Sequence, residues 1–179
     1  MKYKEDAIKQ EIVYDGKIIK VRKDIAKTTD DKEVFREVVE HPGGVGIALE
    51  DEKGKFFLVR QFRYGQSMEM LEFPAGKKEI GEDPLETAKR EIEEETGYKG
   101  EDFIELGEIV PTPAYDTEVI NLYYAKQGEK VGQNFDEDEY IELEKKTLDE
   151  IIDLILNGEI TDAKTVAMAF LIKEKVKRK

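Results

Sequence analysis

The chain has 179 residues, enough for one ordinary hydrophobic core and an appendage, and its 39% hydrophobic and 40% charged residues suit a globular protein. It has no cysteine, which excludes disulfides, thiolate chemistry and Cys-based zinc or iron–sulfur sites. The formal net charge of -13, the lack of a long apolar run and the absence of a signal-type N-terminus predict a cytoplasmic protein that binds neither nucleic acid nor membranes.

The first forty residues read as strands and turns. The turn signal Asp15-Gly16 separates strand-like runs within residues 11–28, and the polar residues 29–32 precede another strand-like run. So small a sheet has little core of its own and must dock on the rest of the chain or on a second copy. We therefore predict an N-terminal antiparallel β appendage over residues 1–41 that acts as the dimerisation element of a homodimer.

The rest of the chain, residues 42–179, has a mixed pattern and forms the predicted main domain. Strands are expected at residues 45–50, 55–62, 71–76, 103–110, 119–126 and 140–146. One helix is expected between the third and fourth of these strands. Two more helical stretches, separated by Asn157-Gly158, end the chain. The sequence thus predicts an α+β class in which helices pack on a mixed sheet.

The segment from residue 83 to residue 97 carries the signals of one helix. Asp83 is a good N-cap, Pro84 fits the first helical position, and Glu86 completes a capping-box-like pair. Gly97 can take the left-handed conformation that ends a helix. The apolar residues recur at helical spacing and predict one narrow stripe packed on a sheet: Leu85, Ala88 and Ile92.

The last two turns of this helix are crowded with carboxylates: Glu91, Glu93, Glu94 and Glu95. The C-terminal end of a helix has a partial negative charge, so each carboxylate there is opposed by about 0.3 to 1 kcal/mol. Helical periodicity places Glu91 and Glu95 on the same flank of the apolar stripe, where their like charges also repel each other. The arrangement makes sense if divalent metal ions bind this face; the alternative is a solvated acidic surface.

A second acidic run, residues 136–139, follows a polar loop and precedes a strand-like segment. Acids on a loop can reach a metal site, although such a run can also be a solvated acidic loop. Hydrolysis of a diphosphate needs cations that neutralise the phosphate oxygens and a base that takes a proton from water. Oxygen ligands, no cysteine and a single histidine point to Mg²⁺, or to Mn²⁺, rather than to zinc.

The acidic helix and the loop before it resemble a known family signature. Residues 76–98, GKKEIGEDPLETAKREIEEETGY, match the Nudix hydrolase signature at each of its fixed positions: Gly76, Glu82, Arg90, Glu91, Ile92, Glu94, Glu95, Gly97 and Tyr98. The segments PAGKKEIGEDP and FLVRQFR, with Pro113 beyond the signature, resemble the ADP-ribose pyrophosphatase branch. The resemblance implies a Nudix-type α/β/α sandwich and Mg²⁺-dependent hydrolysis of ADP-ribose to AMP and ribose 5-phosphate by a metal-activated water.

The resemblance also implies roles for individual residues. The implied metal ligands are the carbonyl of Ala75 and the side chains of Glu91, Glu94, Glu95 and Glu139. Glu137 would be the base that orients or deprotonates the water, and the reverse assignment of Glu137 and Glu139 stays open. Glu82 and Arg90 are interpreted as a structural ion pair that braces the loop before the helix.

Four residues are predicted to contact the substrate. Arg63 is the first choice for the phosphates, because a planar guanidinium pairs with two phosphate oxygens. Arg36 would reach the adenosine side, within one copy or across a dimer, and Gly76 and Glu118 are further substrate-side candidates by resemblance. The alternative for each arginine is a plain surface charge, and for Glu118 a plain loop carboxylate.

Two other functions stay open. The same chemistry could act on another nucleoside diphosphate derivative, such as a sugar nucleotide, NADH or a dinucleoside polyphosphate. The chain could also be a non-catalytic nucleotide sensor, although a pure binder has no reason to keep Glu91, Glu94 and Glu95 against the helix dipole.

Overall fold

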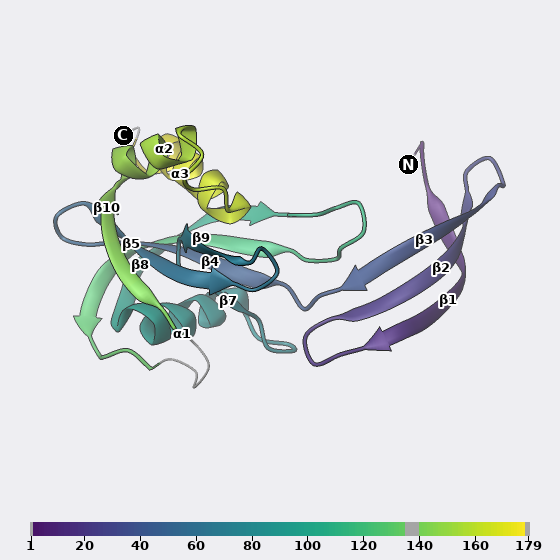
Figure 1. The fold of residues 1–179 in the computed structure, drawn as a ribbon, viewed down its shortest axis with the longest axis horizontal. Coiled ribbons are helices and arrows are strands. Elements are labelled where there is room, and N and C mark those ends of the chain that lie inside the picture. The colour runs from purple at the N-terminus through teal and green to yellow at the C-terminus, as the bar shows by residue number, and fades with distance from the viewer. Residues whose placement is uncertain (1, 135–139, 178–179) are drawn as a thin grey trace. The chain divides into compact units, whose positions relative to one another are not determined.

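The computed structural model of the chain describes residues 2–134 and 140–177 (Figure 1). The chain divides into two compact units, each with its own sheet. None of the helices formed by the described residues has the length and apolar character that spanning a bilayer requires.

The first unit, Met1–Gly43 with Val110–Val119, contains a small antiparallel sheet. Its strands pair in the order β1-β2-β3, with the bounds β1 (Glu5–Asp15), β2 (Lys20–Thr28) and β3 (Glu33–Glu40). In the turn between β1 and β2 the N–H of Gly16 donates to the carbonyl of Ile19 at 3.0 Å. The predicted N-terminal antiparallel sheet and its first hairpin are therefore confirmed.

Residues 110–119 join this first unit although they lie far from it in the sequence. The N–H of Val39 in β3 donates to the carbonyl of Tyr115 at 2.7 Å, and the N–H of Thr117 donates to the carbonyl of Val39 at 3.0 Å. The sequence carries no local signal for this pairing, because it depends on backbone groups that are distant along the chain.

The second unit, Gly44–Ile109 with Ile120–Lys179, contains a mixed sheet. Its strands among the described residues are β4 (Gly44–Glu50), β5 (Lys55–Arg63), β6 (Met68–Glu72), β7 (Ala75–Lys77), β8 (Tyr98–Ile109), β9 (Ile120–Lys130) and β10 (Glu142–Thr147). The order is β10-β5-β4-β9-β8, with β6 paired to β5 and β7 paired to β4. Only β4 and β9 run parallel among these described pairs, so the predicted mixed sheet is confirmed.

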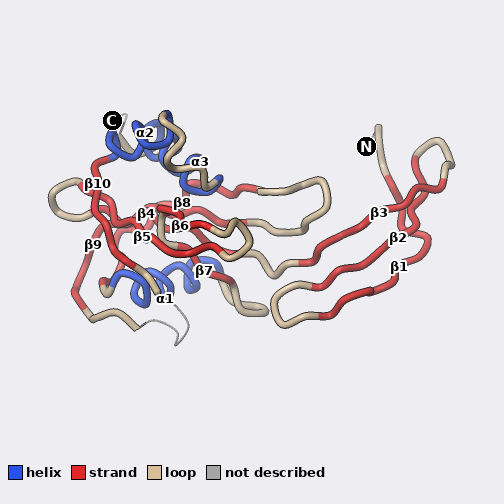
Figure 2. The backbone as a smooth tube through the Cα atoms, viewed as in Figure 1, coloured by secondary structure: helices blue, strands red, loops and turns tan. Residues whose placement is uncertain are grey.

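Helices cover both faces of this mixed sheet, as Figure 2 shows. One face carries α1 (Pro84–Thr96), and the other carries α2 (Leu148–Leu156) and α3 (Ala163–Lys175). The helix α2 starts with a full capping box between Thr147 and Glu150, which explains why the chain turns from β10 directly into a helix. The predicted α/β/α sandwich is confirmed.

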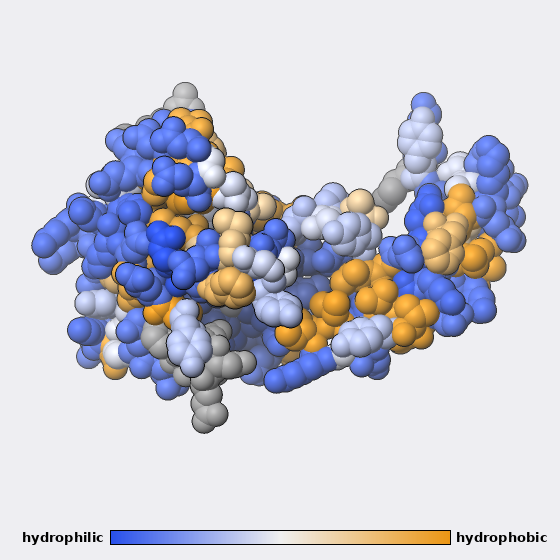
Figure 3. Space-filling view, viewed as in Figure 1, coloured by the Kyte–Doolittle hydropathy of each residue, from blue (hydrophilic) through white to orange (hydrophobic). Residues whose placement is uncertain are grey.

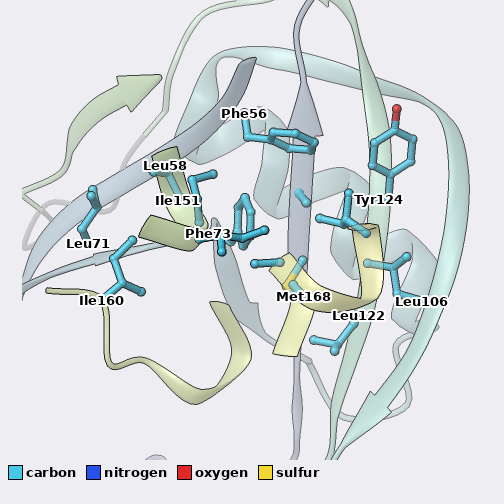
Figure 4. Close-up of a cluster of buried hydrophobic side chains, with 14 residues drawn as sticks. Phe56, Leu58, Leu71, Phe73, Leu106, Leu122, Tyr124, Ile151, Ile160 and Met168 are labelled. Atoms are coloured by element: carbon cyan, nitrogen blue, oxygen red, sulfur yellow. The ribbon is translucent and has the colours of Figure 1, made fainter. Parts of the chain in front are cut away.

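The strand β5 explains why both faces of the sheet must be covered. Phe57 belongs to the buried cluster on the α1 side, whereas its neighbours Phe56 and Leu58 belong to the cluster on the side of α2 and α3. A strand that is apolar on both faces is stable only when both faces are buried. Figure 4 shows the second cluster, in which Phe73 and Met168 meet the strand residues.

Candidate active site

The helix α1 begins and ends where the sequence predicts. The side chain of Asp83 accepts two backbone N–H groups of the first turn, and Pro84 takes the first position. Gly97 ends the helix with a φ of 74°, in the left-handed region that favours glycine. The Glu86 carboxylate accepts from Lys89 Nζ at 2.7 Å, so the reciprocal half of the expected capping box is not formed by these described residues.

Glu95 lies against the start of β7. Only 4% of the residue is exposed, and its Oε2 accepts the N–H of Ala75 at 3.1 Å. Ala75 in turn pairs with Gly46 of β4, so the sheet fixes the backbone that the Glu95 side chain contacts. The structure therefore brings together two of the predicted metal-binding positions, the backbone of Ala75 and the carboxylate of Glu95.

Glu91 lies against the next residue of β7. A Cβ atom at Gly76 would come within 1.8 Å of the Glu91 carboxyl carbon and within 2.1 Å of one of its oxygens. A side chain at position 76 would therefore displace the Glu91 carboxylate from its place against β7. Ala75, Gly76, Glu91 and Glu95 thus form one group where α1 meets β7.

Arg90 is the cation of this group. Its Nη1 donates to Glu91 at 2.7 Å and to Glu94 at 3.1 Å, while Nε and Nη2 donate to Glu82 at 3.3 and 3.2 Å. The predicted Glu82–Arg90 ion pair is confirmed. The contacts of Arg90 with the two helix carboxylates were missed, although the i,i+4 spacing of Arg90 and Glu94 is a signal for one of them.

These contacts change the electrostatics of the loop before α1. The hydrogen bond from Arg90, helped by the backbone N–H of Glu79, lowers the pKa of Glu82 to about 2. Burial opposes the charge of Arg90, but its hydrogen bond to Glu82 and the charge of Glu91 outweigh burial and raise the pKa of Arg90. Arg90 is therefore a permanent charge that offsets part of the negative charge of the α1 face.

The chemistry of the donors fits a hard divalent cation. All of the candidate ligands are carboxylate or carbonyl oxygens, which Mg²⁺ and Mn²⁺ prefer over nitrogen or sulfur. Within residues 2–134 and 140–177, no three side chains of His, Cys, Asp or Glu gather into a ready-made metal cluster. Mg²⁺ is commonly bound by one or two carboxylates together with substrate phosphates, so Glu91 and Glu95 suffice for such a site.

A short segment covers the C-terminal end of α1. The N–H of Asn134 donates to the carbonyl of Glu94 at 3.1 Å, and Nε2 of Gln133 donates to the carbonyl of Glu95 at 2.9 Å. These donors satisfy carbonyl groups that a helix end otherwise leaves without partners. The chain then continues into residues 135–139, so the predicted catalytic residues Glu137 and Glu139 lie outside the described residues.

Arg63, the predicted phosphate contact, is held by a carboxylate that the sequence analysis did not single out. Its Nε and Nη2 donate to the two oxygens of Glu72 at 2.8 and 2.6 Å. The hydrogen bond to Glu72, with the charges of Glu72, Asp162 and Glu95, raises the pKa of Arg63 against the effect of burial. The charge of Arg63 thus interacts with that of Glu95, the buried carboxylate of α1.

Arg36 and Glu118, the other predicted substrate contacts, belong to the first unit. Arg36 donates to Glu5 through Nε at 2.9 Å and through Nη2 at 2.5 Å, and both side chains are exposed. The carboxylate of Glu118 lies 3.3 Å from Nδ1 of His41. Each residue therefore has a partner within its own unit.

Comparisons with known proteins identify the family of the chain. The sequence profile of the family described as NUDIX domain matches residues 40–168. The methanol dehydrogenase activator of Bacillus methanolicus is 38% identical over 99% of this chain and 98% of that protein. The ADP-ribose pyrophosphatase of Bacillus subtilis (strain 168) is 34% identical over 90% of this chain and 88% of that protein.

A solved structure matches the fold. The crystal structure of an ADP compounds hydrolase superposes with a TM-score of 0.86, covering 97% of this chain and 95% of that chain, at 23% sequence identity. At that level of identity the match supports the architecture of the two sheets and three described helices.

Proposed function

This chain belongs to the Nudix family and is a hydrolase, and we propose that it cleaves the diphosphate bond of ADP-ribose to give AMP and ribose 5-phosphate. The observation that carries the proposal is the contact between α1 and β7, where the carboxylates of Glu91 and Glu95 lie against the backbone of Gly76 and Ala75. The Bacillus subtilis relative, named an ADP-ribose pyrophosphatase, supports this substrate.

The cofactor we propose is Mg²⁺, with Mn²⁺ as a substitute. Glu91, Glu95 and the carbonyl of Ala75 would hold the ion, and Glu94 and Glu139 are the further ligands. When bound, the ion would neutralise charge on the phosphate oxygens and lower the pKa of a bound water.

The chain's own residues would bind the diphosphate and move the proton. Arg63 would donate to a phosphate oxygen with the part of its guanidinium that Glu72 does not use. The acidic loop would supply the base, Glu137, which takes the proton of the attacking water, or Glu139 if the two roles are reversed. This assignment rests on the resemblance of the sequence, as do the substrate contacts proposed for Arg36, Gly76 and Glu118.

Incubation with ADP-ribose and Mg²⁺ in ¹⁸O-labelled water tests the proposed function. We expect equal amounts of AMP and ribose 5-phosphate, with the label in one product, and loss of the reaction when EDTA is added. Intact ADP-ribose after incubation, with hydrolysis of a different substrate under the same conditions, would contradict the substrate assignment. A panel with a sugar nucleotide, NADH and a dinucleoside polyphosphate covers the alternative substrates.

A second candidate function is favoured by the Bacillus methanolicus relative, which matches nearly the full chain and is named a methanol dehydrogenase activator. In this alternative the chain acts on, or together with, a dehydrogenase. Adding the protein with Mg²⁺ to a methanol dehydrogenase and measuring methanol oxidation tests it. A faster methanol oxidation that is lost with the Glu95→Gln variant would support activation through the same site. An unchanged rate of methanol oxidation would contradict this second function.

We also propose a homodimer formed through the first unit. In Figure 3 hydrophobic surface gathers over its three-stranded sheet. The exposed large apolar residues there are Ile8, Ile12, Val13, Tyr14, Ile18 and Phe35. A patch of this kind on a soluble protein commonly marks an interaction surface. Light scattering is expected to give the mass of two chains at micromolar concentration, and the mass of one chain would contradict the proposal.

A further inference from the structure

The buried carboxylate of Glu72 binds two cationic side chains, Arg63 and Lys164. Glu72 is the last residue of β6 and only 2% of it is exposed. Arg63 donates to both of its oxygens, and Nζ of Lys164 donates to Oε2. Burial alone would raise the pKa of Glu72, but the hydrogen bond from Arg63 and the charges of both cations lower it to about 2. The carboxylate is therefore ionised at any working pH.

Lys164 reaches the Glu72 carboxylate from α3. It lies in the first turn of α3, is only 5% exposed, and also donates to the N-cap residue Asp162 at 2.9 Å. Its stem passes over Gly46, where an added Cβ would lie 3.7 Å from the Lys164 Cδ. Gly46 is the residue of β4 that pairs with Ala75, so the lysine stem packs on the strand residue next to the proposed metal-binding backbone.

The neighbouring residue makes a second connection between α3 and the same segment. The hydroxyl of Thr165 accepts the N–H of Phe73 at 2.9 Å and donates to Asp162 at 2.6 Å. The carbonyl of Pro74 accepts the N–H of Ile47 at 2.8 Å. Because the segment after Glu72 is fixed by these hydrogen bonds, the chain does not need Lys164 simply to hold that segment in place.

The contact with Glu72 fixes the orientation of the Arg63 guanidinium. A bidentate pair fixes the plane of a guanidinium as well as its distance. The Arg63 side chain is 39% exposed, and within the described part of the chain Nη1 has no hydrogen-bond partner. One edge of the guanidinium is thus anchored on buried Glu72, and the remaining N–H groups are available to an anion.

We propose that Glu72 and Lys164 are positioning residues that fix the guanidinium plane of Arg63 for a phosphate of the substrate. Glu72 orients Arg63 directly, and Lys164 keeps the Glu72 carboxylate from rotating. This inference rests on the proposed function, because it takes the substrate to be a nucleoside diphosphate. Misplacement of a substrate-positioning group commonly reduces kcat/KM by about 10- to 100-fold.

The test compares Glu72→Gln and Lys164→Met with the matched control Glu144→Gln. Glu144 accepts Nε and Nη2 of Arg60, another arginine of β5, so the control breaks the same type of ion pair away from Ala75. Steady-state kinetics with ADP-ribose and calorimetric binding of ADP-ribose without metal are measured for all variants. Melting temperature and circular dichroism monitor the fold.

We expect both test variants to raise KM and the Kd of ADP-ribose about tenfold, with a smaller effect on kcat, whereas the control matches wild type. Lys164→Arg keeps a charged donor and should recover most of kcat/KM. If Glu72→Gln does not fold, the KM and Kd values of Lys164→Met and Lys164→Arg test the inference instead. Test variants with the KM and Kd of the control overturn this inference alone. A wild-type protein that neither binds nor cleaves ADP-ribose overturns it together with the proposed function.

Discussion

The helices α1 and α3 lie on opposite faces of the same sheet, have 13 residues each and start at an aspartate N-cap. The last turn of α3 carries Lys173 and Lys175, in the favourable sense for the helix dipole. The last turn of α1 carries acidic residues and no basic residue. The two lysines at the end of α3 favour stability, whereas the acidic end of α1 carries a local electrostatic cost, which we attribute to the proposed cation site.

Each helix has a charged site near the Phe73–Gly76 segment where the charge opposes the helix dipole. In α1 it is the acidic C-terminal end, which Arg90 and the donors of Gln133 and Asn134 partly compensate. In α3 it is Lys164, a buried cation near the N-terminus that Glu72 and Asp162 compensate. Both exceptions lie beside the Phe73–Gly76 segment, which is where we propose that the chemistry occurs.

The largest expected effect is on activity. Glu95→Gln should reduce kcat about 100-fold or more, because metal stabilisation of developing charge contributes several kcal/mol. The amide can still accept the N–H of Ala75, and one negative charge near the helix end is removed, so the melting temperature without metal should stay the same or rise. Turnover close to wild type in the variant would show that Glu95 is not a metal ligand.

The next effect is on stability against acid. Glu72 has a pKa of about 2 in the folded chain, against 4.5 for a glutamate outside the fold. Its contribution to the free energy of unfolding is therefore present above pH 4.5 and is lost as the pH falls towards 2. The shift corresponds to about 3 kcal/mol. The free energy of unfolding of Glu72→Gln, measured with urea, should lie below wild type by a constant amount above about pH 5 and approach it as the pH falls towards 2. A pH-independent difference would contradict the ionised state.

A smaller effect is expected for Arg90→Gln. The loss of three partly exposed ion pairs should lower the free energy of unfolding by about 1 kcal/mol, or the melting temperature by a few degrees. Mg²⁺ should recover part of this loss, since it replaces the missing positive charge beside Glu91 and Glu94. Differential scanning fluorimetry with and without Mg²⁺ measures both quantities, and an identical deficit in the two conditions would count against a metal at this face.

The smallest effects compare the two helix ends directly. Glu93→Gln on α1 should stabilise the protein by about 0.3 to 1 kcal/mol without changing turnover, and Lys173→Gln on α3 should destabilise it by a similar amount. Chemical denaturation measures both variants under the same conditions. Destabilisation by both substitutions would remove the dipole argument for the acidic end of α1.

The helix α1 could be predicted almost completely from the sequence because its signals are local. Asp83, Pro84 and Gly97 fix its ends through their own backbone and side-chain chemistry, and helical periodicity places Glu91 beside Glu95. The i,i+4 spacing of Arg90 and Glu94 also predicts their contact, although the sequence analysis did not use it.

The rest of the site depends on contacts between distant segments, for which a sequence has no local signal. Lys164 and Glu72 are 92 residues apart, and the side chain of Gln133 contacts the carbonyl of Glu95 across a separation of 38 residues. The expected strand over residues 71–76 is two strands, β6 and β7, because Pro74 has no N–H for a ladder and the chain changes partner from β5 to β4 there.

The central claim is that the acidic end of α1 binds a divalent cation, and calorimetric titration of Mg²⁺ into the wild-type protein and the Glu91→Gln/Glu95→Gln double variant tests it directly. The account predicts saturable binding at millimolar or lower concentration in the wild type and its loss in a folded double variant. Equal binding by both proteins, or no binding by the wild type, would contradict it.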